Sequence, residues 1–372
     1  APAVPANPGS LFGGTADASR APNVVYPNDG VMVPPNLRQL DVHWRPGNAA
    51  NSLYEVSLAS ATIDLKYYVR CGTVQNGGCV MQLDGTGFKY VAESNRGGGP
   101  IAITVRGTDD NGAAVGTSAS RALTFAQENV EGGLYYWTTS NGTGIMRFDF
   151  GSTQTVPEAF LTPSQDGFPT CVGCHALSRD GKKMASSLGG QNDGRLVYIP
   201  DMAKAKSDPS FFAMKGDTNN RIQFASFSPD GSRIAAVYGD TSSPGRNTLW
   251  FHNGDTGARI PGESIQLPFE PDHPDWSPDG KMIAMTHVGT HQTSQRPFNG
   301  GIDLLTRNAN GTWPATTDVV IPIVAGKNRY NPNFVPDSSF FLYSESTCAN
   351  GSTGSDCDAD ADNTAKTWAA KP

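Results

Sequence analysis

The stretch of sequence that decides the fold is PDWSPDGKMIAMTHVG, residues 274–289. In Ser-Pro-Asp-Gly the proline presets φ for the second position of a type I turn, and the glycine takes the left-handed position that closes a hairpin with a bulge. The stretch therefore predicts a β-hairpin, and it recurs about every 50 residues. The other copies are HALSRDGKKMAS (175–186), ASFSPDGSRIAAVYGD (225–240) and PNFVPDSSFFLYSES (332–346), which align on Asp180, Asp230, Asp279 and Asp337.

Further strand-like runs follow the hairpins and complete a repeat. They are GRLVYIPD (194–201), NTLWFHNGD (247–255) and GGIDLLTRN (300–308). Four strands in about 50 residues are the unit of a propeller blade. The hairpins resemble TolB-like, WD40-related β-propeller repeats, and the resemblance covers residues 132–372. It implies a fold rather than a function, because such propellers host many activities. The copies SRDG and VPDS depart from the pattern and leave the number of blades open.

The two ends of this region predict an incomplete ring. GGLYYWTTSNGTGIMRFDFG (132–151) has the pattern of an outer strand pair whose inner pair comes from elsewhere. At the other end, KTWAA (366–370) supplies a third strand after the last hairpin. We therefore expect the ring, or the natural chain, to continue beyond Pro372. Otherwise a partner chain would have to cover an open edge.

Composition and the first third of the chain complete an all-β prediction. The 372 residues include 42 glycines and 27 prolines, which favour short strands and tight turns. Residues 23–127 hold strand-like runs, among them FKYVAE (88–93) and the alternating Ile101, Ile103 and Val105. This length suits an immunoglobulin- or fibronectin-like sandwich with Trp44 as its core aromatic. Residues 1–22 have the composition of a flexible leader, or of a scar from an expression vector.

Charge and hydropathy exclude two classes of partner. The net charge is −7, so no basic face is available for a nucleic acid. No run of eighteen apolar residues could span a bilayer. The sequence also contains no nucleophile elbow, P-loop, dinucleotide fingerprint or H-E-x-x-H motif. The first residue is Ala1 rather than Met, as expected of a processed, exported chain.

The motif that carries chemistry is Cys171-Val172-Gly173-Cys174-His175. Two thiols at this spacing can add to the two vinyl groups of a haem, and a histidine directly after the second thiol can bind the iron. The stretch resembles the attachment motif of c-type cytochromes. The resemblance implies one haem c, with Cys171 and Cys174 as covalent anchors and His175 as the proximal ligand. A zinc site, a thioredoxin-like redox pair and a plain disulfide are the alternatives.

The remaining cysteines form two close pairs. Cys71 and Cys79 flank a short loop and suit a bridge across a hairpin. Cys348 and Cys357 can pair in the same way. With both pairs bridged and Cys171 and Cys174 bound to haem, none of the six cysteines would remain a free thiol. Disulfides and attached haem both indicate a bacterial periplasm, cell surface or extracellular space.

Alignment of the repeats suggests a second iron ligand. Cys174 and His273 each precede their turn aspartate by six residues, so they occupy equivalent positions in two blades. The loop that contains His287 and His291 is expected on the same face. We therefore predict His273 or His291 as the distal ligand, with a surface role or a five-coordinate iron as alternatives. The side chains judged less suitable are Met282 and Met285, which suit a core, His43 in the sandwich and His252 in an outer strand.

A second metal is predicted from CDADADN, where Asp358, Asp360 and Asp362 alternate. Alternate carboxylates resemble the opening of a calcium loop. The alternative is a solvated acidic loop closed by the Cys348–Cys357 bridge.

Together these features predict an exported monohaem cytochrome that transfers single electrons to redox partner proteins or other cytochromes, and that assembles with like chains. Two other functions stay open. One is a cell-surface module that binds a protein or glycan. The other is a haem-dependent oxidoreductase with an open iron site.

Overall fold

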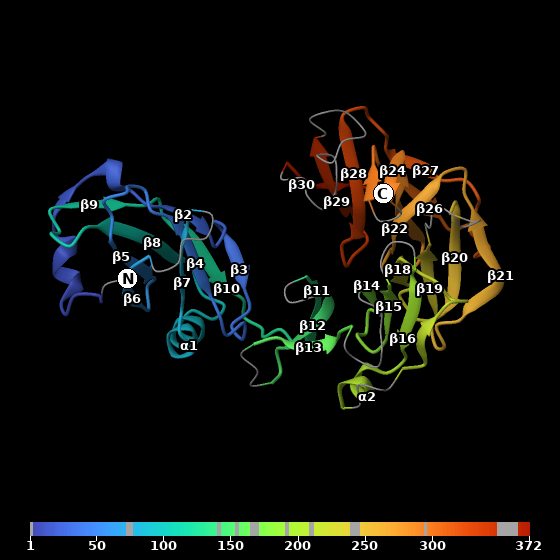
Figure 1. Ribbon diagram of the computed structural model, residues 1–372, viewed down its shortest axis with the longest axis horizontal. Coiled ribbons are helices and arrows are strands. Elements are labelled where there is room, and N and C mark those ends of the chain that lie inside the picture. Colours follow the sequence, from blue (N-terminus) through green and yellow to red (C-terminus); the bar gives the residue numbers. More distant parts are fainter. Residues whose placement is uncertain are drawn as a thin grey trace. The chain divides into compact units, whose positions relative to one another are not determined.

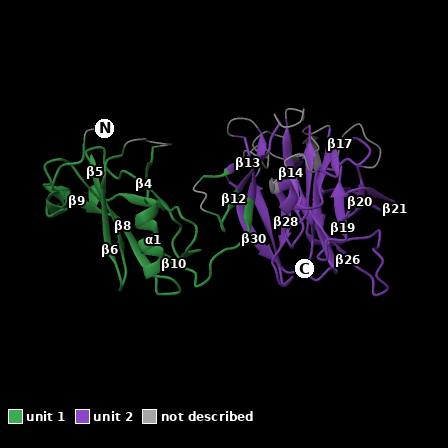
Figure 2. Cartoon of the chain, turned by 90° about the horizontal axis from the view of Figure 1, so that it is seen from below, with its two compact units in different colours: residues 1–134, 148–157 green, residues 135–147, 158–372 purple. Residues whose placement is uncertain are grey.

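The structure is a computed structural model (Figure 1) that is built almost entirely of β-strands. It describes residues 3–71, 77–139, 143–152, 156–163, 171–189, 193–207, 212–238, 246–293, 296–347 and 364–372. The chain divides into two compact units, residues 1–134 with 148–157 and residues 135–147 with 158–372 (Figure 2). The first unit is a β-sandwich and the second is a β-propeller, which confirms the predicted fold class. Among the described residues, no helix has the length and apolar character needed to cross a membrane.

The first unit packs two sheets around one core. Trp44 and Tyr54 are fully buried there with ring centroids 5.3 Å apart, and Ile101, Ile103 and Val105 alternate into the same core as predicted. The larger sheet contains β1 (Thr15–Ala16), β3 (Val31–Val33), β5 (Leu53–Ala59), β6 (Asp64–Val69), β8 (Ile101–Thr108), β9 (Ala114–Thr117) and β10 (Arg121–Phe125). The smaller contains β2 (Asn23–Tyr26), β4 (Asp41–Arg45) and β7 (Cys79–Gln82).

The run FKYVAE, which we expected to be a strand, lies instead in helix α1 (Gly85–Ser94). Asp84 caps this helix, because its Oδ1 accepts the backbone N–H groups of Thr86 and Gly87 at 3.0 and 2.9 Å. Phe88 and Val91 then face the core at helical spacing. The capping aspartate, rather than the apolar run itself, is the signal for a helix here.

The predicted flexible leader is also wrong, because residues 3–20 pack against the sandwich. Two 3₁₀ turns, η1 (Pro8–Phe12) and η2 (Ala18–Arg20), flank β1, which pairs in parallel with β9. Phe12 is 4% exposed and packs against Leu53 and Val115. One buried aromatic anchor therefore orders a segment whose composition alone predicts disorder.

The second unit consists of five successive antiparallel sheets. The first strands of the four hairpin repeats, β14, β18, β22 and β28, contact one another in this order. The sheets are β11 (Gly133–Thr138), β12 (Gly144–Asp149) and β13 (Glu158–Leu161); β14 (Val172–Leu177), β15 (Met184–Leu188), β16 (Arg195–Ile199) and β17 (Met214–Asp217); β18 (Phe224–Phe227), β19 (Arg233–Val237), β20 (Thr248–Asn253) and β21 (Arg259–Gln266); β22 (Glu270–Trp276), β23 (Met282–Val288), β26 (Gly301–Thr306) and β27 (Asp318–Ile321); and β28 (Lys327–Phe334), β29 (Phe341–Thr347) and β30 (Lys366–Ala370). Helix α2 (Met202–Ser207) and the hairpin of β24 (Thr290–Thr293) and β25 (Arg296–Phe298) are additions to this pattern.

The predicted hairpin turns are confirmed, and hydrogen bonds explain their sequence. In the second copy, Asp230 Oδ1 accepts the Ser228 hydroxyl at 2.6 Å and the Ser232 backbone N–H at 3.0 Å. Gly231 has φ 66°, the left-handed conformation that glycine adopts without a steric cost. In the fourth copy Ser338 takes this position, with φ 61°.

The opening segment differs from its prediction as an outer strand pair. It forms a three-stranded sheet, because β13 pairs with β12. Ile145 and Leu161 of this sheet share a core with Val172 and Met184 of the next. Apolar packing between sheets therefore joins the opening segment to the first hairpin repeat. The last sheet has the expected third strand, β30.

Candidate functional site

The aligned positions before the turns form a repeated irregularity in the innermost strands. Cys174, His273 and Asn331 have φ values of 48°, 42° and 53°, which non-glycine residues rarely adopt. At each of the three, the strand pairing shifts register. Phe224, at the fourth equivalent position, continues a regular ladder. A β-bulge re-aims side chains, so in three of these four sheets the same position of the repeat is turned away from regular packing.

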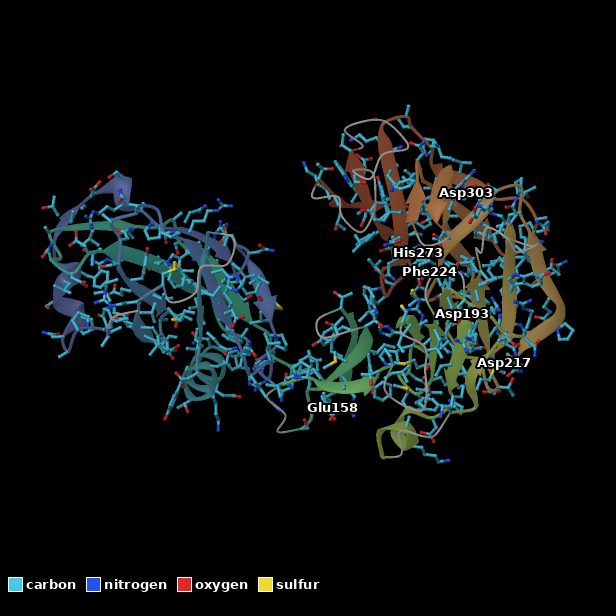
Figure 3. All side chains as sticks on the ribbon, in the orientation of Figure 1. Glu158, Asp193, Asp217, Phe224, His273 and Asp303 are labelled. Carbon is cyan, nitrogen blue, oxygen red and sulfur yellow. A yellow bond between two sulfur atoms is a disulfide. The ribbon has the colours of Figure 1, made fainter. Side chains whose placement is uncertain are left out.

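These four positions meet at one cavity of about 270 Å³. Its walls come from β14, β18, β22 and β28, and include Cys174, His175, Phe224, His273 and Asn331. Cys174 and His273, which the repeat alignment predicted to be equivalent, therefore line the same cavity. Figure 3 shows His273 beside Phe224, within the propeller unit.

The sheet of β11–β13 contacts the stretch Cys171–His175 and holds it in place. The Val172 backbone N–H donates to Thr143 Oγ1 at 3.1 Å, and the Val172 carbonyl accepts the Trp137 indole N–H at 2.8 Å. A Cβ on Gly173 would lie 2.7 Å from Trp137 Nε1, so glycine is required by close approach. Cys171 and Cys174 are half-buried and present as thiols.

His175 is a half-buried imidazole on strand β14. Its Nε2 lies 3.4 Å from the Tyr135 carbonyl oxygen. Burial lowers the pKa of His175, which favours the neutral ring. The neutral imidazole is the form that binds a metal ion.

His273 is held by two neighbours. Its ring stacks on Phe224 with centroids 3.5 Å apart and planes 26° from parallel. Its Nδ1 lies 3.3 Å from Asp272 Oδ1, and the same carboxylate oxygen accepts the His273 backbone N–H at 2.9 Å. Nδ1 has no hydrogen-bond partner among the residues that the structure describes, so the carboxylate lies beside the ring and holds the residue through its backbone N–H.

Asp275 lines this cavity and links the strands that form it. One carboxylate oxygen accepts the Ser226 hydroxyl of β18 at 3.1 Å, and the other accepts the Phe334 backbone N–H of β28 at 2.7 Å. Burial raises the pKa of Asp275, while these hydrogen bonds oppose the rise. A carboxylate that links three inner strands fixes the spacing of the cavity walls.

The other side chains weighed as iron ligands, where the structure describes them, do not line this cavity. His287 stacks on Phe269 with centroids 3.8 Å apart and contacts Asp303 Oδ1 at 3.2 Å. Met285 is fully buried and Met282 packs in a neighbouring core, as expected of core residues. The backbone of His291 belongs to β24, but its side chain falls outside the described residues.

His43 and His252, which the sequence made less suitable as iron ligands, also make contacts outside this cavity. His43 packs in the sandwich unit against Tyr26, with ring centroids 5.3 Å apart. His252 is fully buried in β20, with Nδ1 2.9 Å from the Gly257 carbonyl oxygen. Both belong to structural contacts away from the cavity.

The disulfide between Cys71 and Cys79 is confirmed, with Cα atoms 5.1 Å apart. The second predicted pair and the predicted calcium loop lie outside the described residues. They are Cys348, Cys357, Asp358, Asp360 and Asp362. Within the described part of the chain, no three His, Cys, Asp or Glu side chains gather as metal ligands do.

The sequence analysis missed three residues of the cavity region: Phe224, Asn331 and Asp275. The first two could have been found, because both stand six residues before a turn aspartate. Asp275 carries no such signal, since its role depends on which strands become its neighbours.

The residues at the cavity suit the attachment of the predicted haem, but the cavity is smaller than a whole haem. Two thiols and a neutral histidine are the chemistry that covalent haem attachment needs. The volume of about 270 Å³ is just below the roughly 300–1,000 Å³ of pockets that bury most of a small ligand. The cavity can therefore enclose part of a porphyrin and not the whole ring.

Comparisons with known proteins give distant likenesses. No family model and no curated protein matches the chain. The hydrazine synthase of Kuenenia stuttgartiensis is 16% identical, with a TM-score of 0.38 over 68% of this chain and 75% of that one. The dihydro-heme d1 dehydrogenase NirN is 13% identical, with a TM-score of 0.32 over 68% of this chain and 48% of that one. Both TM-scores are below 0.5.

Proposed function

We propose that this chain is an exported c-type cytochrome that binds one haem covalently and passes single electrons to redox partner proteins or other cytochromes. One observation carries the proposal. The thiol of Cys174 and the imidazole of His175 line a cavity on the innermost strand of a propeller sheet, and His273 of another sheet lines it too.

Attachment needs no reagent beyond the haem. Each thiol of Cys171 and Cys174 adds across one vinyl group: a carbon–sulfur bond forms, the vinyl π bond breaks, and the thiol proton goes to the second vinyl carbon. Once bound, the haem supplies a one-electron couple. Cys174 and His175 belong to strand β14 and Cys171 directly precedes it, so the three residues are already close together, which reduces the entropy lost when all three bind one group.

The chain's own residues would set the iron ligands. His175 follows the second thiol directly and is kept neutral by burial. His273 is the candidate for the second ligand, since the stacked Phe224 ring fixes the plane of its imidazole. Two imidazole ligands would make a six-coordinate electron carrier rather than a site that binds small molecules.

Export is supported by the disulfide between Cys71 and Cys79, because disulfides persist in oxidising compartments. The proposal therefore places the protein in a bacterial periplasm, at the cell surface or outside the cell. A reduced cytoplasm would not preserve the bridge.

The test is the intact mass of protein made in a host that attaches haem c. We expect the mass of the chain plus one haem, and a reduced spectrum typical of haem c. Cys174→Ser should lose covalently held haem, whereas the matched variant Cys71→Ser, in the other unit, should keep it. A wild-type mass equal to that of the chain alone would overturn the proposal.

A further inference from the structure

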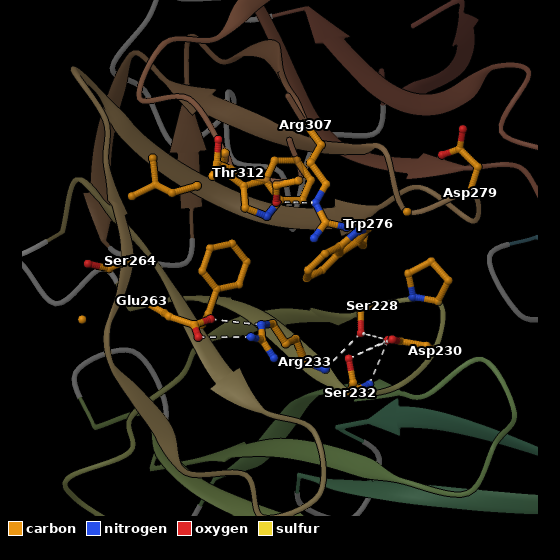
Figure 4. Close-up of a pocket in the computed structure, with 17 residues that line it drawn as sticks. Ser228, Asp230, Ser232, Arg233, Glu263, Ser264, Trp276, Asp279, Arg307 and Thr312 are labelled. Carbon is orange, nitrogen blue, oxygen red and sulfur yellow. Dashed lines mark hydrogen bonds and ion pairs between the residues drawn. The ribbon is translucent and has the colours of Figure 1, made fainter. Parts of the chain in front are cut away.

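A second and larger cavity, of about 670 Å³, lies between the sheets of β18–β21 and β22–β27 (Figure 4). The hairpin turns at Asp230 and Asp279 contribute to its wall. His273 and Trp276 both belong to β22, but His273 lines the smaller cavity and Trp276 the larger one. One inner strand therefore contributes side chains to both cavities.

Three aromatic rings form the apolar part of this wall. Phe251 and Trp276 meet edge to face with centroids 5.8 Å apart, and Trp276 and Trp313 do so at 5.5 Å. The Arg307 guanidinium carbon lies 5.8 Å from the centre of the Trp313 ring. Trp313 is only half-buried, so part of its ring is available to a molecule in the cavity.

The second observation is a buried donor without an acceptor. Trp276 is 3% exposed, and its indole Nε1 has no hydrogen-bond partner among the residues that the structure describes. Burying an N–H without an acceptor destabilises a folded protein, so such a group calls for an explanation. A ligand oxygen in this cavity would supply the missing acceptor.

Charges of both signs surround the rings and largely neutralise one another. Arg233 forms a two-point ion pair with Glu263, with N–O distances of 3.0 and 3.1 Å. Asp230 and Asp279 accept hydrogen bonds within their own turns. This mixture gives no field of a single sign, which argues against a nucleotide or another polyanion as the ligand.

We propose that this cavity binds a neutral saccharide. A pyranose has an apolar C–H face that packs on aromatic rings such as Trp313, and a rim of hydroxyl groups that both donate and accept hydrogen bonds. One hydroxyl oxygen would accept the Trp276 N–H, and others would meet the guanidinium of Arg307 and the carboxylate of Glu263. The proposal does not rest on haem attachment, because none of these residues lines the smaller cavity.

The test is calorimetric titration of the whole chain with cellobiose and with diacetylchitobiose, two neutral disaccharides whose rings have flat C–H faces. We expect at least one to bind with a Kd of about 1 mM or tighter. Trp313→Ala should weaken that binding tenfold or more, by roughly the effect of losing an aromatic stacking partner. Trp368→Ala, which removes an exposed tryptophan of β30 away from the cavity, should leave it unchanged.

Trp276→Phe keeps an aromatic ring and removes the N–H, and we expect it to weaken binding about threefold to tenfold, the value of one hydrogen bond. Thermal unfolding of each variant checks that it folds. Absence of binding by both disaccharides up to about 10 mM would overturn the proposal. So would tighter binding of indole-3-acetate, which would assign the cavity to planar acids. Binding that survives Trp313→Ala would also contradict it.

Discussion

Cys174 and His273 occupy the same place in two different sheets of the propeller: each has a left-handed backbone, each interrupts the register of an innermost strand, and both line one cavity. A strained backbone at equivalent positions is typical of sites that hold a ligand. The relationship makes His273 the candidate for a second iron ligand in the proposed cytochrome, and it leads to the first prediction.

His273→Ala should keep covalently attached haem and change its spectrum. In the proposed cytochrome the thioether bonds would depend on Cys171 and Cys174, whereas the second iron ligand would be His273. We expect an unchanged intact mass and, in optical and electron paramagnetic resonance spectra, loss of the six-coordinate low-spin signature. The matched control is His287→Ala on the next strand, because His287 contacts Asp303 and Phe269 instead. Equal spectra for wild type and His273→Ala would exclude His273 as a ligand.

Asp275→Ala should destabilise the propeller unit by about 2–4 kcal/mol, because it leaves the buried Phe334 N–H and Ser226 hydroxyl without their acceptor. Urea unfolding followed by tryptophan fluorescence measures the change. Asp337→Ala, at an exposed turn of the same unit, should cost less. Equal losses for the two variants would contradict the bridging role of Asp275.

Replacing both Cys71 and Cys79 by alanine should destabilise the sandwich unit by about 2–3 kcal/mol. The bridge closes a loop of eight residues, and its main effect is to limit the unfolded chain. The propeller unit should keep its stability, which differential scanning calorimetry can resolve as a separate transition. A shift of the propeller transition, with the sandwich transition unchanged, would contradict this prediction.

The propeller should lose stability in mild acid through His252. Burial, with the positive charge of Arg259 as a smaller cause, lowers the pKa of this histidine to about 4. Between that value and the ordinary pKa of about 6.5, the unfolded chain binds more protons than the folded one. Stability should therefore fall as the pH drops through this window, by on the order of 3 kcal/mol.

His252→Asn tests this pH effect, because its amide N–H can donate to the Gly257 carbonyl in place of the histidine Nδ1–H. The variant should show a shallower loss of stability when urea midpoints are compared at about pH 7 and about pH 4.5. The same slope in wild type and variant would assign the acid sensitivity to other groups.

The sequence alone determined the repeat, its hairpin turns and the attachment motif. These features are local: Pro229, Asp230 and Gly231 specify a turn through their own φ preferences and a side chain two residues away. The equivalence of Cys174 and His273 is local too, since both are counted from a turn. The disulfide between Cys71 and Cys79 closes a short loop and could be predicted for the same reason.

Only the tertiary structure decided what these positions meet. The stacking of His273 on Phe224, the bridge from Asp275 to Ser226 and Phe334, and the unpartnered N–H of Trp276 all join segments about 50 residues apart or belong to walls built from several sheets. The ordering of residues 3–20 has the same origin, because Phe12 finds its core on strands far along the chain. Packing between sheets depends on shape and burial, which no local pattern encodes.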